Sequence, residues 1–342
     1  MKLLSVAIPC YNSESYMSHC IESLLPGGNE VEIIIVNDGS TKDNTLKVAR
    51  DFEAKYPEII KVVDKPNGGH GSAVNYGLKN ATGRYFKVVD SDDWVDEVTY
   101  PKILETLRSF SDEENQIDML LSNFIYDKQG ASHKKAIDFR KSLPVGKVFG
   151  WDECKKFSIG KYILMHSIIY RTQVLRDVKL ELPEHCFYVD NLFAFIPFPQ
   201  VKKIYYIDIN FYHYFIGRND QSVNEKVMIK RIDQQLRVNT IMMQEFKKNE
   251  ANFESNPHLK DYMYAYLEGV TAVSSIMCVV SKDKEIYEKK DKLWQFIKET
   301  DLETYNKMRS KLYPGLMSKT TPLRNWLSTV VYRIAQKFFG FN

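Results

Sequence analysis

In the segment VVDSDDWVDE, residues 88–97, an apolar run ends and three carboxylates follow it closely: Asp90, Asp92 and Asp93. Carboxylates this close repel one another unless a positive charge lies among them. Mg²⁺ and Mn²⁺ prefer oxygen ligands and are commonly held by one or two carboxylates together with phosphate oxygens. The spacing of Asp90 and Asp92 as D-x-D therefore predicts a divalent cation, and an acidic turn or helix N-cap is the alternative.

Similar polar clusters follow other apolar runs, namely PCYN (9–12), NDGS (37–40) and DKPNGGHG (64–71). Asp38 could accept hydrogen bonds from a base or ribose, or close its strand as an Asx-turn. The glycines of NGGHG expose backbone N–H groups just before a helix, which suits an anion or a sugar, although a tight turn is equally open. The segment matches neither a Walker A motif nor G-x-G-x-x-G.

The elements that must position these clusters alternate along the chain. Strands are expected at 3–9, 31–36, 59–64, 84–89 and 117–124, and helices at 14–25, 41–56, 72–80 and about 98–110. This alternation predicts an α/β fold with a mostly parallel sheet flanked by helices. Ligands bind such sheets beyond the carboxyl ends of the strands, where all four clusters lie. We therefore expect them to converge on one site.

The rest of the chain is expected to be mixed and then helical. Helices are predicted at 151–158 and 189–198, and strands near 201–207 and 210–216. From residue 224 the pattern is helical throughout, which predicts two domains, 1–222 and 223–342.

Composition limits the class of protein. The 342 residues carry 47 basic and 44 acidic side chains, a net charge of +3, which gives no indication of nucleic-acid binding. The five cysteines form no C-x-x-C pair, so a reducing cytoplasm is expected. The N-terminus does not resemble a signal peptide, and we expect no run of about 18–20 apolar residues that could span a membrane.

The chain resembles the family 2 glycosyltransferases, which are inverting enzymes with a GT-A (Rossmann-like) fold. The resemblance lies in residues 5–24, 32–45 and 67–95, and more loosely in 187–193 and 212–223. It implies a GT-A domain followed here by a C-terminal helical region.

The resemblance also implies roles for individual residues. Positions facing the nucleotide-sugar would be Pro9, Tyr11, Glu14, Asp38, Lys65, Asn67, Gly71, Asp90, Ser91, Asp93, Arg218 and Ser222. Asp38 would lie near the uracil or ribose, Asp93 would face the donor sugar, and Arg218 and Ser222 would hold the diphosphate. Asp92 would be the more direct metal ligand beside Asp90. His213 would be a further ligand or a packed strand histidine.

Asp190 matches the family's catalytic aspartate. The family usually has Glu-Asp at this point, whereas Val189 precedes Asp190 here. A carboxylate in this role takes the proton of an acceptor hydroxyl as it attacks the anomeric carbon. The alternative is a helix N-cap before NLFAFI.

The implied function is inverting, metal-dependent transfer of a sugar from a UDP-sugar to a glycan or lipid-linked acceptor, with Mn²⁺ or Mg²⁺, in surface polysaccharide synthesis. Two other classes stay open. A sugar-phosphate nucleotidyltransferase also uses an α/β sheet, carboxylates and Mg²⁺. A non-catalytic binding subunit would tolerate Val189.

The C-terminal segment 321–342 is amphipathic. Its apolar face comprises Leu323, Trp326, Leu327, Val330, Val331, Ile334 and Phe338, and its charges are all basic. Such a helix could lie on the inner face of the cell membrane or dock on protein, including a second copy of the chain. Both remain open, and the expected location is cytoplasmic in either case.

Overall fold

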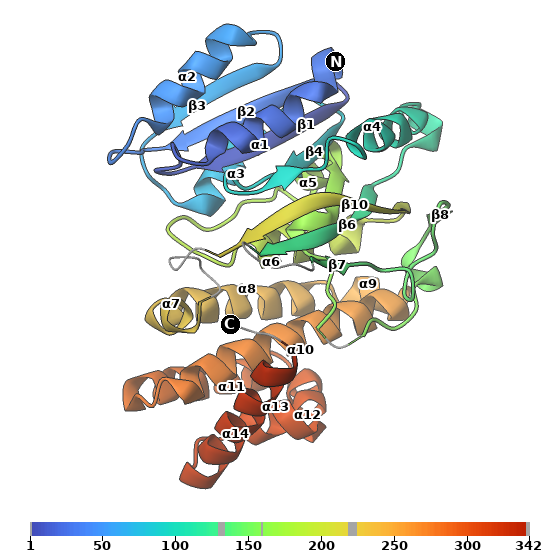
Figure 1. The fold of residues 1–342 in the computed structure, drawn as a ribbon. Helices are drawn as coiled ribbons and strands as arrows, with labels where there is room; N and C mark the ends of the chain where they lie inside the picture. Colours follow the sequence, from blue (N-terminus) through green and yellow to red (C-terminus); the bar gives the residue numbers. More distant parts are fainter. Residues whose placement is uncertain (1, 129–133, 159, 218–223, 340–342) are drawn as a thin grey trace. The chain divides into compact units, whose positions relative to one another are not determined.

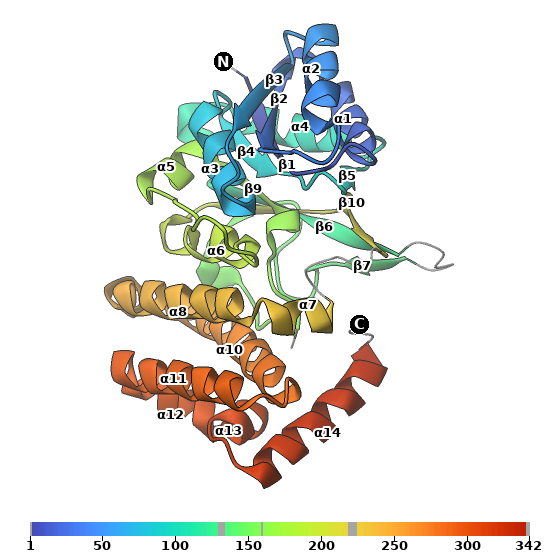
Figure 2. The ribbon, with the colours of Figure 1, turned by 90° about the vertical axis from the view of Figure 1, so that its left-hand side faces the viewer.

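The computed structural model describes residues 2–128, 134–158, 160–217 and 224–339, and it is drawn in Figures 1 and 2. The chain forms two compact units, Met1–Gly217 and Arg218–Asn342. The predicted domain boundary, between residues 222 and 223, lies outside the described residues.

One sheet organises the first unit. Its strands lie in the order β3 (Ile60–Lys65), β2 (Val31–Asp38), β1 (Leu4–Cys10), β4 (Tyr85–Val88), β9 (Ile168–Arg171), β6 (Met119–Lys128), β10 (Ile204–Ile216) and β5 (Trp94–Val95). Two short strands are attached at the side: β7 (Lys135–Ile137) pairs with β6, and β8 (Val148–Phe149) pairs with β10. The longest ladders are parallel, as predicted, and antiparallel β9 separates β4 from β6.

The central strands are buried on both faces because helices cover them. All residues of β1 and β2 are buried, which explains their continuous apolar runs. The covering helices are α1 (Met17–Leu24), α2 (Thr45–Lys55), α3 (His70–Asn80) and α4 (Tyr100–Ser109), and Figure 2 shows helices on both sides of these strands. Helix α3 approaches β1 so closely that a Cβ atom on Gly77 would lie 2.5 Å from the Cβ atom of Ala7.

Three predicted elements differ in the structure. In place of the helix predicted at 151–158 there is only a short 3₁₀ turn, Trp151–Glu153, whose buried Trp151 indole donates to the Val201 carbonyl (3.0 Å). The two strands predicted near 201–207 and 210–216 are one strand, β10, whose register with β6 shifts between Tyr206 and Tyr212. The helix predicted at 189–198 is the shorter α6, Asp190–Phe195.

The second unit is helical in its described residues. Its helices are α7 (Glu225–Lys230), α8 (Ile232–Lys248), α9 (Glu250–Glu254), α10 (Pro257–Val280), α11 (Lys284–Thr300), α12 (Leu302–Ser310), α13 (Leu312–Met317) and α14 (Pro322–Phe339). Polar pairs fix the register between α8 and α10: Asn239 donates to the Thr271 hydroxyl (3.0 Å), and Gln235 donates to the Ser274 hydroxyl (3.1 Å).

Contrary to the expectation from sequence, α10 is long and apolar enough to cross a membrane by length and composition. However, 72% of its apolar window is buried inside the protein, as is usual for the core helix of a soluble protein.

Candidate active site

Hydrogen bonds join the loops that follow β1 and β2. The side-chain oxygen of Asn12 accepts from the backbone N–H groups of Thr41 (3.2 Å) and Lys42 (3.1 Å). The Glu14 carboxylate accepts from the backbone N–H (2.8 Å) and the side-chain N–H (3.0 Å) of Asn44. These bonds hold the pKa of Glu14 below its usual value. Glu14, predicted to face the nucleotide, therefore also fixes the loop before α2.

The loop after β1 also reaches the acidic segment that follows β4. The Oγ atoms of Ser13 and Ser91 lie 3.0 Å apart. Pro9 is buried within β1, and Tyr11, just beyond the strand, is 48% exposed. The structure thus brings the polar clusters after β1, β2 and β4 to one edge of the sheet, as the sequence predicts.

Asp38 is buried at the end of β2 and binds the glycine-rich loop after β3. Its Oδ1 atom accepts from the Lys65 ammonium (2.5 Å) and from the backbone N–H of Gly68 (2.9 Å). Its Oδ2 atom accepts from the backbone N–H of Gly69 (2.7 Å) and the side-chain N–H of Asn67 (3.1 Å). Asp38, Lys65 and Asn67 are thus brought together as predicted. Part of the hydrogen-bonding capacity of Asp38 is used to shape the loop.

The start of α3 packs against residues 182–185, which lead to α6. The Asn75 side chain donates to the Leu182 carbonyl (2.8 Å) and accepts from the Leu182 N–H (2.9 Å). A Cβ atom on Gly71 would lie 2.8 Å from the carbonyl oxygen of Pro183, so only glycine allows this close approach. Gly71, predicted as a donor-binding residue, therefore has a packing role that positions the chain leading to Asp190.

The acidic segment after β4 is held by Tyr212 of β10. The Tyr212 hydroxyl donates to the Asp93 carboxylate (2.5 Å) and accepts from the backbone N–H of Asp90 (3.2 Å). The other oxygen of Asp93 accepts from the backbone N–H of Phe215 (2.8 Å). On the opposite side, Asp90 Oδ1 lies 2.7 Å from Nε2 of His70, the first residue of α3.

The charges of this group shift one another's pKa values. Burial alone would raise the pKa of Asp90, but the charge and hydrogen bond of His70 hold it below its usual value. Burial alone would lower the pKa of His70, but Asp90, with smaller contributions from Asp190 and Asp92, raises it. Burial and the neighbouring charges of Asp92 and Asp90 raise the pKa of Asp93 well above normal. A positive ion placed here would relieve the repulsion between these carboxylates.

Two buried basic side chains lie beneath the carboxylates. Lys87 is fully buried in β4, where its ammonium donates to the carbonyl of His166 (2.8 Å), and burial lowers its pKa to about 7. Burial likewise lowers the pKa of His166 to about 4. The Nδ1 atom of His166 is buried and has no hydrogen-bond partner among the described residues.

The donor set suits a hard divalent cation. Among the described residues, ligand atoms of Asp90, Asp93 and His166 lie within 4.8 Å of one another. Asp92, which stands between the two aspartates in the sequence, is half-buried. Carboxylate oxygens are the ligands that Mg²⁺ and Mn²⁺ prefer. Of the two predicted ligands, Asp90 belongs to this group, whereas Asp92, predicted as the more direct ligand, is not among its members.

His213, the third predicted ligand, lies with other partners. Its Nδ1 atom is 3.1 Å from Asp127 and its Nε2 atom is 3.8 Å from Asp96, and its ring stacks on Trp94 with centroids 5.2 Å apart. Successive side chains of a strand point to opposite faces of the sheet. Because Tyr212 points toward the carboxylate group, His213, the next residue, points to the other face. The structure thus gives His213 the surroundings of a packed strand histidine.

Asp190 is the first residue of α6, and the chain before it has an unusual backbone. Tyr188 has a φ of 66°, in the left-handed region that side chains other than glycine rarely adopt. Burial raises the pKa of Asp190, with His70 acting in the opposite direction. Asp190 therefore lies within the electrostatic range of His70 and Asp90, and its raised pKa suits a proton acceptor. Arg218 and Ser222, predicted to hold the diphosphate, lie outside the described residues.

Four residues of this group are absent from the sequence-based site: His70, Lys87, His166 and Tyr212. His70 lies inside the NGGHG segment, between Gly69 and Gly71, so its position was an available signal. His166 and Tyr212 carry no local signal, because distant pairings position them. His166 lies in the 3₁₀ turn before β9, which pairs with β4, and Tyr212 lies on β10, which pairs with β5 just after the acidic segment.

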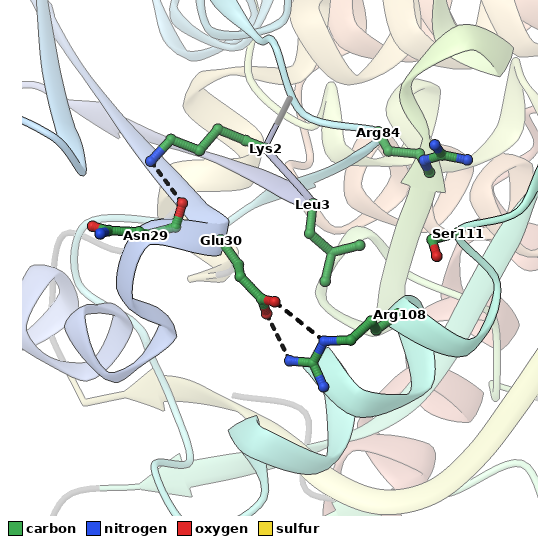
Figure 3. Close-up of a pocket in the computed structure, with 7 residues that line it drawn as sticks. All are labelled: Lys2, Leu3, Asn29, Glu30, Arg84, Arg108 and Ser111. Atoms are coloured by element: carbon green, nitrogen blue, oxygen red, sulfur yellow. Dashed lines mark hydrogen bonds and ion pairs between the residues drawn. The ribbon is translucent and has the colours of Figure 1, made fainter.

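A hollow of about 230 Å³ lies elsewhere, at the opposite edge of the sheet (Figure 3). Lys2 and Arg84, which line it, precede β1 and β4, so the hollow is near the amino ends of these strands. The Arg108 guanidinium in its wall is paired with Glu30 (2.7 Å). This hollow contains none of the predicted site residues.

Residues 5–130 match the family described as Glycosyl transferase family 2. The uncharacterized glycosyltransferase EpsJ of Bacillus subtilis is 28% identical over 235 residues, which are 65% of this chain and 63% of that protein. The poly(ribitol-phosphate) beta-N-acetylglucosaminyltransferase TarS of Staphylococcus aureus is 27% identical over 228 residues, 66% of this chain and 37% of that protein. The matches thus span less than two thirds of either relative.

Two solved structures share the fold. The crystal structure of S. aureus TarS 1-349 in complex with UDP-GlcNAc superimposes with a TM-score of 0.52 at 20% identity and covers 90% of both chains. The mannosyltransferase PcManGT from Pyrobaculum calidifontis, in complex with GDP-Man and Mn²⁺, gives a TM-score of 0.51 at 11% identity, covering 97% of this chain and 80% of that chain. The likeness confirms the predicted GT-A fold with a C-terminal helical region.

Proposed function

Because residues 5–130 form a family 2 glycosyltransferase domain, we propose that this chain transfers a sugar from a UDP-sugar to a glycan or lipid-linked acceptor, with inversion and with a divalent cation. The observation that carries the proposal is the position of His70. Its Nε2 atom is 2.7 Å from Asp90, and its pKa is raised by Asp90 and, to a smaller extent, by Asp190. The expected metal motif and the expected base therefore both act on His70, which supports their belonging to one site.

The reaction class follows from the two kinds of carboxylate. Asp190 accepts the proton of the acceptor hydroxyl while the hydroxyl oxygen bonds to the anomeric carbon. The bond from that carbon to the diphosphate oxygen breaks on the opposite face, and the nucleoside diphosphate leaves with the bonding electrons. One displacement inverts the anomeric centre. The raised pKa of Asp190 supports this assignment, because a more basic carboxylate is a better proton acceptor.

Asp90 and Asp92, with Asp93 and His166 close to Asp90, would hold Mn²⁺ or Mg²⁺. When bound, such a cation neutralises the charge that develops on the leaving diphosphate. Asp38 and Lys65 shape the loop beside it, and Tyr212 holds the acidic segment in place. Arg218 and Ser222 are proposed, from the resemblance alone, to add donors to the diphosphate.

The choice of UDP and of acceptor is supported by the relatives. TarS binds UDP-GlcNAc and acts on poly(ribitol-phosphate) according to its description, and it shares 27% identity with this chain. We therefore place the protein in surface polysaccharide or teichoic acid synthesis, working in the cytoplasm. A UDP-N-acetylhexosamine is the first donor to test.

The test is a set of melting temperatures with UDP, GDP, ADP or CMP, each with and without Mn²⁺. A ligand that binds only the folded state stabilises it by about 2.7 kcal/mol at 100 times its Kd and so raises the melting temperature. The native chain, Asp92→Asn and the control Glu97→Gln are compared, because Glu97 is an exposed acid on the same segment. A shift with UDP that requires Mn²⁺, persists in Glu97→Gln and is lost in Asp92→Asn supports the proposal. No shift with UDP and Mn²⁺ contradicts it.

The same protein distinguishes the other classes. A nucleotidyltransferase would release pyrophosphate from a nucleoside triphosphate and a sugar phosphate, whereas the proposed enzyme releases UDP from a UDP-sugar. A binding subunit would bind UDP without releasing it from any UDP-sugar in the presence of acceptor.

A further inference from the structure

Helix α14 leaves much of its apolar face exposed. Its exposed apolar side chains are Leu323 (67%), Trp326 (61%), Val330 (37%), Val331 (42%) and Ile334 (52%). Leu323, Trp326, Val330 and Ile334 follow one another at intervals of three or four residues, so they form one continuous stripe on the helix. We call these four residues the α14 stripe.

Polar contacts hold the opposite face of α14 to the rest of its unit. The Tyr332 hydroxyl donates to the Glu225 carboxylate (2.9 Å), and the Arg333 guanidinium donates to both oxygens of the same carboxylate (2.7 and 2.9 Å). Nearer the start of the helix, Ser328 is fully buried, and Arg324 donates to the Gly315 carbonyl (3.2 Å). The orientation of α14 is therefore fixed by specific bonds.

This arrangement is the reverse of what an amphipathic helix on a protein core normally shows. Such a helix buries its apolar stripe and exposes its polar face, because apolar burial is the main favourable term. A contiguous exposed apolar patch on a folded protein usually marks an interaction site. The exposure of the stripe thus excludes its docking on the helices of its own unit and leaves a membrane or a second copy of the chain.

The charge around the stripe indicates what covers it. No acidic residue occurs in the chain after Glu303, whereas the basic residues after that point are Lys307, Arg309, Lys311, Lys319, Arg324, Arg333 and Lys337. An apolar stripe with Trp, on a segment whose own charged residues after Glu303 are all basic, matches helices that lie in the interface of an anionic bilayer. A second copy of the same basic segment would instead bring like charges together.

We propose that the α14 stripe is a preformed docking face for a membrane surface rich in anionic lipid. Leu323, Trp326, Val330 and Ile334 insert between the headgroups, while Lys311 and Lys319, both exposed, contact the lipid phosphates. This goes beyond the proposed glycosyl transfer and does not depend on it. If both hold, docking places the enzyme where a lipid-linked acceptor lies.

The experiment measures binding of the full chain to vesicles by flotation, without any nucleotide-sugar. Vesicles of phosphatidylglycerol mixed with phosphatidylcholine are compared with phosphatidylcholine alone. The variant Leu323→Ser/Trp326→Ser/Ile334→Ser removes the apolar side chains. The matched control is Val98→Ser, because Val98 is an apolar residue of the first unit that is 87% exposed. A third variant, Lys311→Gln/Lys319→Gln, removes charge alone.

The native chain and Val98→Ser should float with the anionic vesicles, and added salt should weaken the binding because it screens the lysines. The triple variant should bind at least about 100-fold more weakly, since burial of one such side chain is worth about tenfold or more. The double lysine variant should lose preference for anionic over neutral vesicles. Circular dichroism of the triple variant should match the native chain, because the altered residues are exposed.

Three results would overturn the proposal. The native chain could fail to float with anionic vesicles, or the triple variant could float as well as the native chain. Alternatively, sedimentation could show a native dimer that the triple variant converts to a monomer, with no vesicle binding by either. That last result would assign the stripe to a second copy of the chain. All three can be obtained while UDP binding is normal, so they are distinguishable from failure of the proposed transferase activity.

Discussion

Asp38 and Lys65 are register partners at the ends of β2 and β3, and Asp38 Oδ1 lies 2.5 Å from Lys65 Nζ. Both side chains are buried, with relative exposures of 3% and 5%. The parallel pairing of the two strands therefore places a buried ion pair directly beneath the glycine-rich loop. Removal of one partner of such a pair leaves an uncompensated charge, which typically costs about 3–5 kcal/mol.

We expect Asp38→Asn to lower the free energy of unfolding by roughly 3 kcal/mol, because the Lys65 ammonium loses its buried counter-charge. The double variant Asp38→Asn/Lys65→Met should recover the part of that loss that is due to the unpaired charge, which urea unfolding measures. UDP binding by the double variant then separates the two roles of Asp38. Weak binding in a restored fold indicates a nucleotide contact, and normal binding a purely structural role. Unchanged stability in Asp38→Asn would contradict the ion-pair argument.

The buried Lys87 should make the free energy of unfolding depend on pH. Its pKa is about 7 in the folded chain, well below the usual lysine value of about 10.4. Between these two values the unfolded chain binds the proton and the folded chain does not, so stability rises as pH increases from about 7 to about 10. Below about pH 7 both states are protonated and the cost of burying the charge is constant.

The variant Lys87→Met should remove that dependence and should be more stable than the native chain at pH 7, by roughly 1–4 kcal/mol. The difference between the two unfolding free energies should shrink as the pH is raised toward 10. A difference that does not change with pH would show that Lys87 stays charged when folded.

Tyr212 should affect donor binding without touching the donor. Its hydroxyl joins the Asp93 carboxylate to the backbone N–H of Asp90, so Tyr212→Phe leaves both buried groups short of a partner. We expect a loss of about 1–3 kcal/mol in stability and a raised KM for the UDP-sugar, because the acidic segment loses its anchor. Tyr205→Phe is the matched control, since Tyr205 lies on the same strand and packs on Phe110. Equal kinetics for the two variants would contradict this role.

Gly71 links α3 to the chain that carries Asp190. In Gly71→Ala the new Cβ would lie 2.8 Å from the Pro183 carbonyl oxygen, so the segment before α6 must move. A displacement of about 1 Å near a catalytic group can cost about 100-fold in rate, and we expect kcat to fall accordingly. Gly27→Ala is the control, because its Cβ would meet Val31 and Tyr100 instead. It should lose stability and keep kcat.

The sequence predicted the site where the signal is local. Runs such as VEIIIV must be buried strands, and four polar clusters at strand ends must share an edge in a parallel sheet. It could not predict Tyr212 beside Asp93, because β10 shifts its register against β6 just before Tyr212, and that shift decides which residues of β10 face the carboxylates. Likewise, periodicity located the apolar face of α14. Only the bonds of Tyr332 and Arg333 to Glu225 show that this face points outward.

Asp190 provides the most direct test of the chemistry. Burial raises its pKa, and Asp190 must be ionised to accept a proton, so kcat should fall as the pH decreases through that raised value. Asp190→Asn should lower kcat by about 100- to 10,000-fold, the usual contribution of a general base, while binding of UDP with Mn²⁺ stays normal. Asp112→Asn is the control, because Asp112 is an exposed aspartate of the same unit. Full turnover by Asp190→Asn would mean that Asp190 has only a structural role as the first residue of α6 and that another group takes the proton. Loss of turnover together with loss of UDP binding would instead indicate that Asp190 helps to hold the donor.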